Sequence, residues 1–137
     1  MFLLAFVILG FTSYSQKFGY VNSQELLLSL PEVKAADTEL ETYQKQLLSV
    51  GQNKVAEFET EYKKYNEDAQ KGVLSQVQMQ AKEADLAKKQ QEIQQYEVEI
   101  QNQLGAKREE LYKPILDKVK GAIDSYGKEN SYTMIFD

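Results

Sequence analysis

The chain has 137 residues, a net charge of −5 and no cysteine, histidine or tryptophan. This length allows at most one modest domain, so a single copy is not expected to enclose a large hydrophobic core. Without histidine or cysteine there is no imidazole base, no thiolate nucleophile and no zinc site of the usual kind, so the sequence predicts a non-enzyme without cofactor or metal. The negative charge argues against binding to nucleic acid, whose affinity for proteins rests mainly on Lys and Arg.

Residues 1–15 have the features of an export signal. Residues 2–11 form an apolar run that is too short to span a bilayer. Ser13 and Ser15 then place small residues where signal peptidase needs them, which predicts cleavage before Gln16. The alternatives are a buried strand or helix and an uncleaved membrane anchor.

Two short elements are predicted ahead of the first long helix. Residues 17–21 alternate in the manner of a strand and contain two aromatic side chains. Asn22 with Glu25 forms a capping-box pattern, which predicts a short helix that extends to about residue 30. Ser29 and Pro31 repeat this start signal, so we expect a long helix to begin near Pro31 with Ser29 as its cap.

The long helix carries an interrupted coiled-coil seam. Its apolar positions follow the 3-4 spacing of such a seam in two runs: 33, 36, 40, 43 and 47, then 55, 58, 62, 65 and 69. The step from Leu47 to Phe58 does not fit a seven-residue repeat, and such an insertion locally unwinds a supercoil. We therefore expect a straighter and weaker stretch around Gly51.

A turn and a second long helix follow. Gly72 favours the end of the first helix, because glycine readily adopts positive φ, and Ser75 with Gln78 predicts the start of the next one. The new helix repeats apolar residues every seven positions: Met79, Leu86, Ile93 and Ile100. If the helices are antiparallel, residues whose numbers sum to about 145 face each other. The apolar sets then coincide: Tyr65 with Met79, Phe58 with Leu86, Leu47 with Ile100, Tyr43 with Leu104, and Val33 with Leu111 or Tyr112. This agreement predicts a hairpin arm about 60 Å long.

The same register places Pro31 level with Pro114, at the base of the hairpin. A proline inside a helix kinks its axis, so we expect the arm to bend at Pro114 into a root helix that Gly127 ends. Residues 131–137 are predicted to form a second strand, and the edges of both strands are expected to lack partners within one protomer. The sites that should make the arm compliant are Pro31, Pro114, Gly51 and Gly105.

Several segments, taken in order, resemble the Skp/OmpH family of periplasmic chaperones. They are 17–22 (KFGYVN), 30–33 (LPEV), the helical hairpin, 112–123 (YKPILDKVKGAI) and 132–137 (YTMIFD). The resemblance implies a mainly α fold with a small β body, and a homotrimer whose strands form a shared body from which three hairpin arms project around a client. The implied organisation is a signal peptide at 1–15, a body segment at 16–30, an arm at 31–113 with its tip near 71–75, and a second body segment at 114–137.

The resemblance also implies a function and sites. We expect an ATP-independent periplasmic holdase for unfolded outer-membrane proteins. The residues expected in the trimer body are Phe18, Tyr20, Val21, Tyr132, Met134 and Phe136. The candidate client contacts are Tyr62, Met79, Tyr96 and Val98, with Tyr43 as a further candidate, although aromatic residues at seam spacing also pack between helices.

Two departures from the family limit what is carried over. Better-known members are basic, so attachment to anionic lipid or lipopolysaccharide is not expected for this acidic chain. The family also continues past the second strand with another strand and a closing helix, so a C-terminal truncation at Asp137 is considered.

The main alternative is an exported coiled-coil spacer or envelope-tethering protein without client binding. The strand at each end of the hairpin argues against a spacer, which needs no β body. A carboxylate enzyme would need convergent acids in a pocket, whereas most acids here lie along exposed helices.

Overall fold

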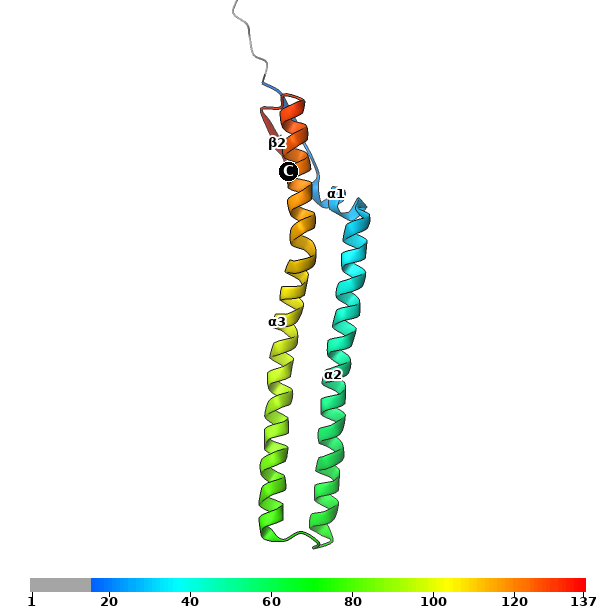
Figure 1. Cartoon of the computed structure of the whole chain (residues 1–137), viewed down its shortest axis with the longest axis vertical. Coiled ribbons are helices and arrows are strands. Elements are labelled where there is room, and N and C mark those ends of the chain that lie inside the picture. Colours follow the sequence, from blue (N-terminus) through cyan, green and yellow to red (C-terminus); the bar gives the residue numbers. More distant parts are fainter. Residues whose placement is uncertain (1–15) are drawn as a thin grey trace, which may run out of the picture.

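The computed structural model describes residues 16–137, in which two long helices form a hairpin and two short strands join its ends. The export signal predicted at residues 1–15 lies outside the described residues. Figure 1 shows the elements in chain order: β1 (Phe18–Tyr20), α1 (Ser23–Ser29), α2 (Pro31–Gln70), α3 (Gln76–Glu129) and β2 (Met134–Phe136). The fold is thus mainly α with a small β-sheet, as the sequence predicted.

The starts of the helices follow local capping chemistry. The Asn22 side chain accepts a hydrogen bond from the Glu25 backbone N–H at 3.0 Å, which confirms the predicted start of α1. The prediction of Ser29 as the cap of α2 is wrong, because Ser29 still belongs to α1 and its hydroxyl donates to the Leu26 carbonyl oxygen at 2.6 Å. Leu30 is the N-cap of α2 instead, and the fixed φ of Pro31 suits the first helical position.

The tip of the hairpin lies where the sequence placed it. α2 ends at Gln70, and Gly72 has a φ of 67°, a conformation that costs glycine little. The Ser75 hydroxyl then accepts from the Gln78 N–H at 3.3 Å, while the Gln78 side chain accepts from the Ser75 N–H at 2.9 Å. This capping box starts α3 directly after the turn.

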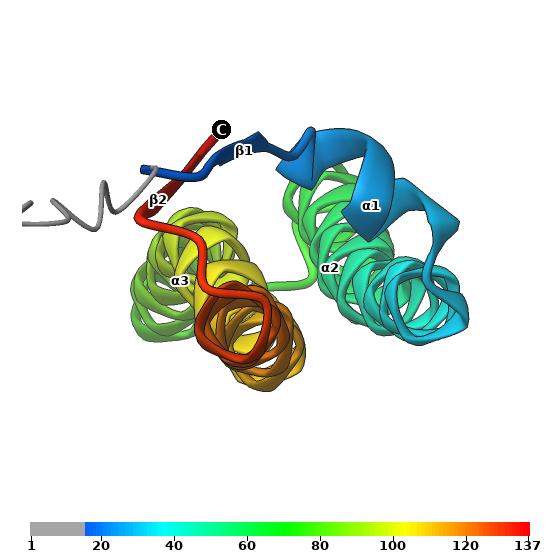
Figure 2. The ribbon, with the colours of Figure 1, turned by 90° about the horizontal axis from the view of Figure 1, so that it is seen from above.

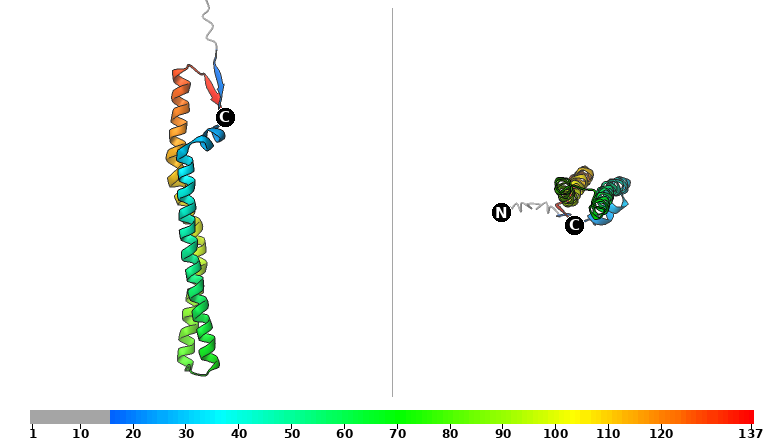
Figure 3. Two further views of the ribbon diagram at one scale, coloured as in Figure 1. Left: turned by 90° about the vertical axis from the view of Figure 1, so that its right-hand side faces the viewer. Right: turned by 90° about the horizontal axis from the view of Figure 1, so that it is seen from below.

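α2 and α3 run antiparallel and lie side by side along the long axis of the molecule (Figure 3). The Tyr43 hydroxyl donates to the Gln103 side chain at 2.8 Å, and the Lys89 ammonium lies 2.7 Å from a Glu61 oxygen. These partners agree with the predicted register to within about one to two helical turns.

The base of α3 differs from the prediction in one respect. α3 continues through Pro114 to Glu129, with Pro114 inside the helix as predicted. Gly127 does not end the helix; the chain turns two residues later, and Ser131 adopts a φ of 55°. Gly127 is buried within α3 because Ile135 packs on it: a Cβ at Gly127 would lie 3.2 Å from the Ile135 Cδ1 atom. The bend predicted at Pro114 stays a prediction.

β1 and β2 pair in parallel, with Phe18 opposite Met134, Gly19 opposite Ile135 and Tyr20 opposite Phe136. Both strands are shorter than predicted. The expectation that their edges lack partners within one protomer is wrong for one edge of each strand, since each edge bonds to the other strand. Figure 2 shows the strands and α1 together along one side of the two long helices. We call β1, β2, α1 and the last turns of α3 the body, and the paired lengths of α2 and α3 the arm.

Candidate functional site

The two helices of the arm meet along a narrow apolar stripe. The buried apolar side chains of residues 16–137 lie on these two helices: Val33, Ala36 and Leu47 on α2, and Leu86, Ile100 and Val119 on α3. Most other arm side chains are exposed to solvent. A stripe this narrow leaves much of the adhesion between the helices to polar contacts.

Four tyrosine hydroxyls donate hydrogen bonds from one helix of the arm to the other. Their acceptors are the Gln103 side chain for Tyr43, the Leu47 carbonyl oxygen for Tyr96, Glu83 for Tyr65 and Asp37 for Tyr112. The bonds to carboxylates raise the pKa values of the Tyr65 and Tyr112 hydroxyls above the ordinary tyrosine value. Tyrosine at a seam position therefore supplies both apolar area and a directed bond across the arm.

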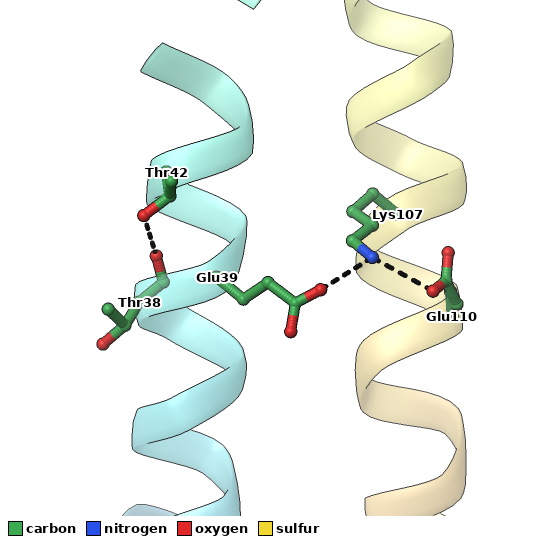
Figure 4. Close-up of polar contacts among 5 residues, drawn as sticks. All are labelled: Thr38, Glu39, Thr42, Lys107 and Glu110. Atoms are coloured by element: carbon green, nitrogen blue, oxygen red, sulfur yellow. Dashed lines mark hydrogen bonds and ion pairs between the residues drawn. The ribbon is translucent and has the colours of Figure 1, made fainter. Parts of the chain in front are cut away.

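Ion pairs add to these bonds at several levels. The Lys107 ammonium lies 2.8 Å from Glu39 on α2 and 3.0 Å from Glu110 on α3, as Figure 4 shows. Its hydrogen bonds to Glu39 and Glu110 raise the pKa of Lys107. Nearer the base, Lys118 lies 2.6 Å from Glu32 and lowers the pKa of that carboxyl. Exposed pairs of this kind contribute little to stability, because solvent screens them.

A groove of about 360 Å³ opens between α2 and α3 where the seam is out of step. Gly51 leaves space on α2, and the Tyr96 ring fills part of it: a Cβ at Gly51 would lie 3.4 Å from the Tyr96 Cε1 atom. We call this feature the arm groove; it is lined by Leu48, Gly51, Gln52, Lys54, Val55, Ala56, Glu59, Ile93, Tyr96, Glu97 and Ile100. The arm groove lies where the step from Leu47 to Phe58 predicted a weaker stretch of the coiled coil around Gly51.

The candidate client contacts lie in different environments. Tyr96 lies in the arm groove with its hydroxyl bonded to α2, and Met79 is half-buried near the tip. Tyr62 is half-exposed and its ring stacks on Phe58 at 5.9 Å between centroids, whereas Val98 is 64% exposed. Their role in binding stays a prediction.

Sequence reasoning missed two exposed apolar residues of the arm groove, Leu48 and Val55. Leu48 lies beside the seam, and Val55 opens the second run at its displaced phase. The sequence held a signal for them. Where the apolar seam of α2 shifts its register, between Leu47 and Phe58, some apolar side chains cannot face α3 and stay exposed.

The predicted body residues divide between the two faces of the sheet. The outer face is largely exposed and apolar, and consists of Phe18, Tyr20, Met134 and Phe136. Val21 and Tyr132 help to line a cavity of about 400 Å³ between the sheet and α3, and Tyr20 borders the same cavity. The Phe18 and Phe136 rings are 6.1 Å apart between centroids, so the outer face is one continuous apolar surface across both strands.

Gly19 is a second body residue, besides Gly127, whose role the sequence did not reveal. A Cβ at Gly19 would lie 2.9 Å from the Tyr132 Cε1 atom, closer than real contacts allow. The Lys17 ammonium caps this packing from outside, 4.0 Å from the centroid of the Tyr132 ring. Gly19 thus lets Tyr132 pack closely on β1, and Gly127 lets Ile135 of β2 pack closely on α3.

The hinge candidates are ordinary helical positions in this structure. Pro31 begins α2, Pro114 lies within α3, and Gly51 and Gly105 lie inside the two helices of the arm. A Cβ at Gly105 would meet no atom within 4 Å. Their part in compliance stays a prediction.

Among residues 16–137 no three His, Cys, Asp or Glu side chains are grouped to hold a metal ion. No helix within these residues is long and apolar enough to cross a membrane. The architecture and its surfaces define an elongated helical-hairpin protein whose exposed apolar areas suit contact with other polypeptides.

The chain belongs to the family described as outer membrane protein (OmpH-like), whose family model matches residues 17–137. This match covers every element described above. Comparison with curated protein sequences gives no match. OmpH-like proteins form a chaperone family associated with outer-membrane proteins, so membership points to a chaperone of the cell envelope.

Proposed function

We propose that this protein is an ATP-independent periplasmic holdase that binds unfolded outer-membrane proteins and prevents their aggregation. The observation that carries the proposal is an arm whose two helices bury only a narrow stripe and leave apolar groups open along its length. Such a surface offers broad, weak and adjustable contacts to many clients. Family membership supports the same kind of partner.

The working unit we propose is a homotrimer joined through the body. The outer face of the sheet is apolar and exposed, with Tyr20 at 76% exposure, and each strand keeps one edge without a β partner among residues 16–137. A two-stranded sheet is marginal by itself and needs further partners. Three arms around one body would surround a client from several sides.

A spacer or tether without client binding accounts less well for these features. The sheet ties residues from both ends of the hairpin together and presents an apolar face, and a spacer needs neither feature. A spacer would also gain from a wide, continuous heptad seam, which the arm lacks.

The test combines assembly with activity. Purified mature protein should form a concentration-dependent trimer in analytical ultracentrifugation and suppress the aggregation of a β-barrel membrane protein diluted from denaturant. Tyr20→Asp should dissociate the trimer while helix content in circular dichroism stays high. Tyr20 is a better probe than Val21, because Val21 is half-buried within one protomer. Absence of protection by a well-formed trimer would favour the spacer.

Export is proposed separately, on the pattern of residues 1–15. Mass spectrometry of envelope fractions should find a mature chain that begins at or near Gln16. Mature protein that retains residues 2–11 would contradict the cleaved signal.

A further inference from the structure

Acidic residues outnumber basic residues around the arm groove. Residues 46–62 of α2 and 90–106 of α3 contain Lys54 as their only base and six acidic residues, which are Glu57, Glu59, Glu61, Glu92, Glu97 and Glu99. These two segments carry −5, and the nearest bases of α3 are Lys88 and Lys89, which directly precede residue 90 and pair with Glu92 and Glu61. We call these segments the acidic band.

The arm groove lies within the acidic band, and two carboxylates of the band line it. Glu59 comes from α2 and Glu97 from α3. Neither takes part in an ion pair with any residue of the described chain 16–137, whereas Glu61 and Glu92 pair with Lys89 and Lys88 just outside the band.

The only base of the groove is already engaged with an aromatic ring. The Lys54 ammonium lies 5.6 Å from the centroid of the Tyr96 ring. Leu48 and Val55 leave apolar surface open beside it. The groove thus combines an apolar floor with carboxylates that have no cation of their own.

We infer that the arm groove binds extended segments of non-native polypeptide in which apolar side chains are flanked by Lys or Arg. This inference rests on the proposed holdase function and specifies which client segments the arm prefers. Apolar side chains would cover Leu48 and Val55, while the flanking cations would pair with Glu59 and Glu97. The volume of about 360 Å³ falls within the range of about 300–1,000 Å³ typical of ligand pockets.

Charge complementarity favours this occupant over two others. A second copy that met the groove at the same level would bring its own acidic band, and like charges oppose such contact. An anionic lipid surface would be repelled for the same reason.

The first measurement compares three fluorescent peptides of equal length by anisotropy at low ionic strength. One has apolar residues flanked by Lys and Arg, the second has the same apolar residues flanked by Asp and Glu, and the third keeps the cations but has Ser in place of the apolar residues. The first peptide should bind about threefold to tenfold more tightly than either of the others. The difference in affinity between the first peptide and the acidic peptide should shrink as salt is added. Equal binding of the basic and acidic apolar peptides would overturn the inference.

The second measurement locates the site with charge variants. Glu59→Gln combined with Glu97→Gln should weaken the basic apolar peptide by about threefold to tenfold. The matched control, Glu109→Gln combined with Asp124→Gln, removes the same charge from exposed positions outside the groove and should change binding by less than about twofold. Equal effects of the two double variants would show that only overall charge matters, and would overturn the assigned site.

The third measurement fills the groove without changing charge. Ala56 lines the groove and is exposed, so Ala56→Phe should occupy it while the arm folds normally. Binding of the basic apolar peptide should fall several-fold, whereas Ala106→Phe, at an exposed position of α3 outside the groove, should leave it unchanged. Unaltered binding by the Ala56 variant would contradict the inference.

The outcomes separate this inference from the function on which it rests. Protection of a β-barrel client without any peptide preference would retain the holdase and remove the groove as its selective site. Peptide selectivity without protection would retain the groove and contradict the holdase. Self-association of the free protein that Ala56→Phe abolishes would assign the groove to a second copy and overturn the inference.

Discussion

α2 and α3 contact each other through a stripe of single side chains supplemented by polar bonds, whereas the body packs closely at two glycines: Ile135 lies against Gly127 of α3, and Tyr132 lies against Gly19 of β1. The arm can therefore absorb changes at most of its surface positions, because few of them bury area. The body has no such tolerance, since atoms added at Gly19 or Gly127 meet a neighbour at once. The arm should therefore tolerate most surface substitutions, whereas the body should not tolerate larger side chains at these two glycines.

The largest expected effect tests whether the narrow stripe holds the arm. Leu47 is 8% exposed and the adjacent Leu48 is 45% exposed. Leu47→Ala should lower the free energy of unfolding by about 2–4 kcal/mol because it removes buried area and leaves a cavity. The matched control Leu48→Ala should change it by less than about 0.5 kcal/mol. Chemical denaturation measures both, and equal losses would show that the stripe is wider than the structure indicates.

The next effect tests the close packing of β2 on α3 in the body. Gly127→Leu would displace Ile135 and should cost about 1–3 kcal/mol through overpacking, with faster hydrogen exchange in β2. Gly121 lies on the same helix, and a Cβ there would meet nothing within 4 Å. Gly121→Leu should therefore raise thermal stability through helix propensity alone. If the two variants had the same stability, close packing of Ile135 on α3 would not contribute to the stability of the body.

A smaller effect tests the compliance of the arm. Gly105→Ala should stabilise by about 1 kcal/mol, because its Cβ meets open space. Gly51→Ala should gain less, since its Cβ would touch the Tyr96 ring at 3.4 Å. The double variant should slow hydrogen exchange in both helices and narrow the range of client sizes protected from aggregation. Gly72→Ala is a control of opposite sign, because the φ of 67° there disfavours alanine.

If the double variant stiffened the arm and still protected small and large clients as well as the parent protein, compliance would not determine client capacity. Binding would then depend on a preformed surface such as the arm groove.

The smallest expected effect concerns pH at the body. The Asp137 side chain accepts hydrogen bonds from the Ser23 hydroxyl and, at 2.9 Å, from the Ser23 backbone N–H, which hold its pKa below the ordinary value of 3.8. Because the pKa is lower in the folded state, this contact stabilises fully above pH 3.8 and is lost as the pH falls through the folded value. Asp137→Asn should therefore melt below the parent protein at neutral pH, and the difference should vanish in acid. Asp124→Asn, an exposed control without an ion pair, should show no such trend.

The helical hairpin could be predicted because its signals are local and repeated. Ser75 with Gln78 sets the start of α3, Gly72 allows the tip to turn, and two apolar stripes agree in register across the arm. The local signals gave a wrong prediction where one residue could serve two helices. Ser29 had the chemistry of a cap for α2, but α1 had already taken its hydroxyl.

The candidate sites were less predictable. The aromatic residues of the two strands were recognised, but not that Tyr132 packs against Gly19 and Tyr126 while Phe18 stays exposed on the outer face. The arm groove was foreseen only as a weak stretch near Gly51. Its lining combines residues about 45 positions apart, such as Val55 and Ile100, so it exists only once the helices are paired.

The sequence by itself determined the helical hairpin, its tip and, to within about one to two turns, the register of the arm, because each depends on spacing along one chain. Only the tertiary structure decided that β1 and β2 pair in parallel. It also decided that Gly127 is a packing position and not a helix end. The physical reason is the same in each case: a strand's partner and a glycine's neighbour are set by residues distant in sequence, such as Ile135 against Gly19, and no local pattern records them.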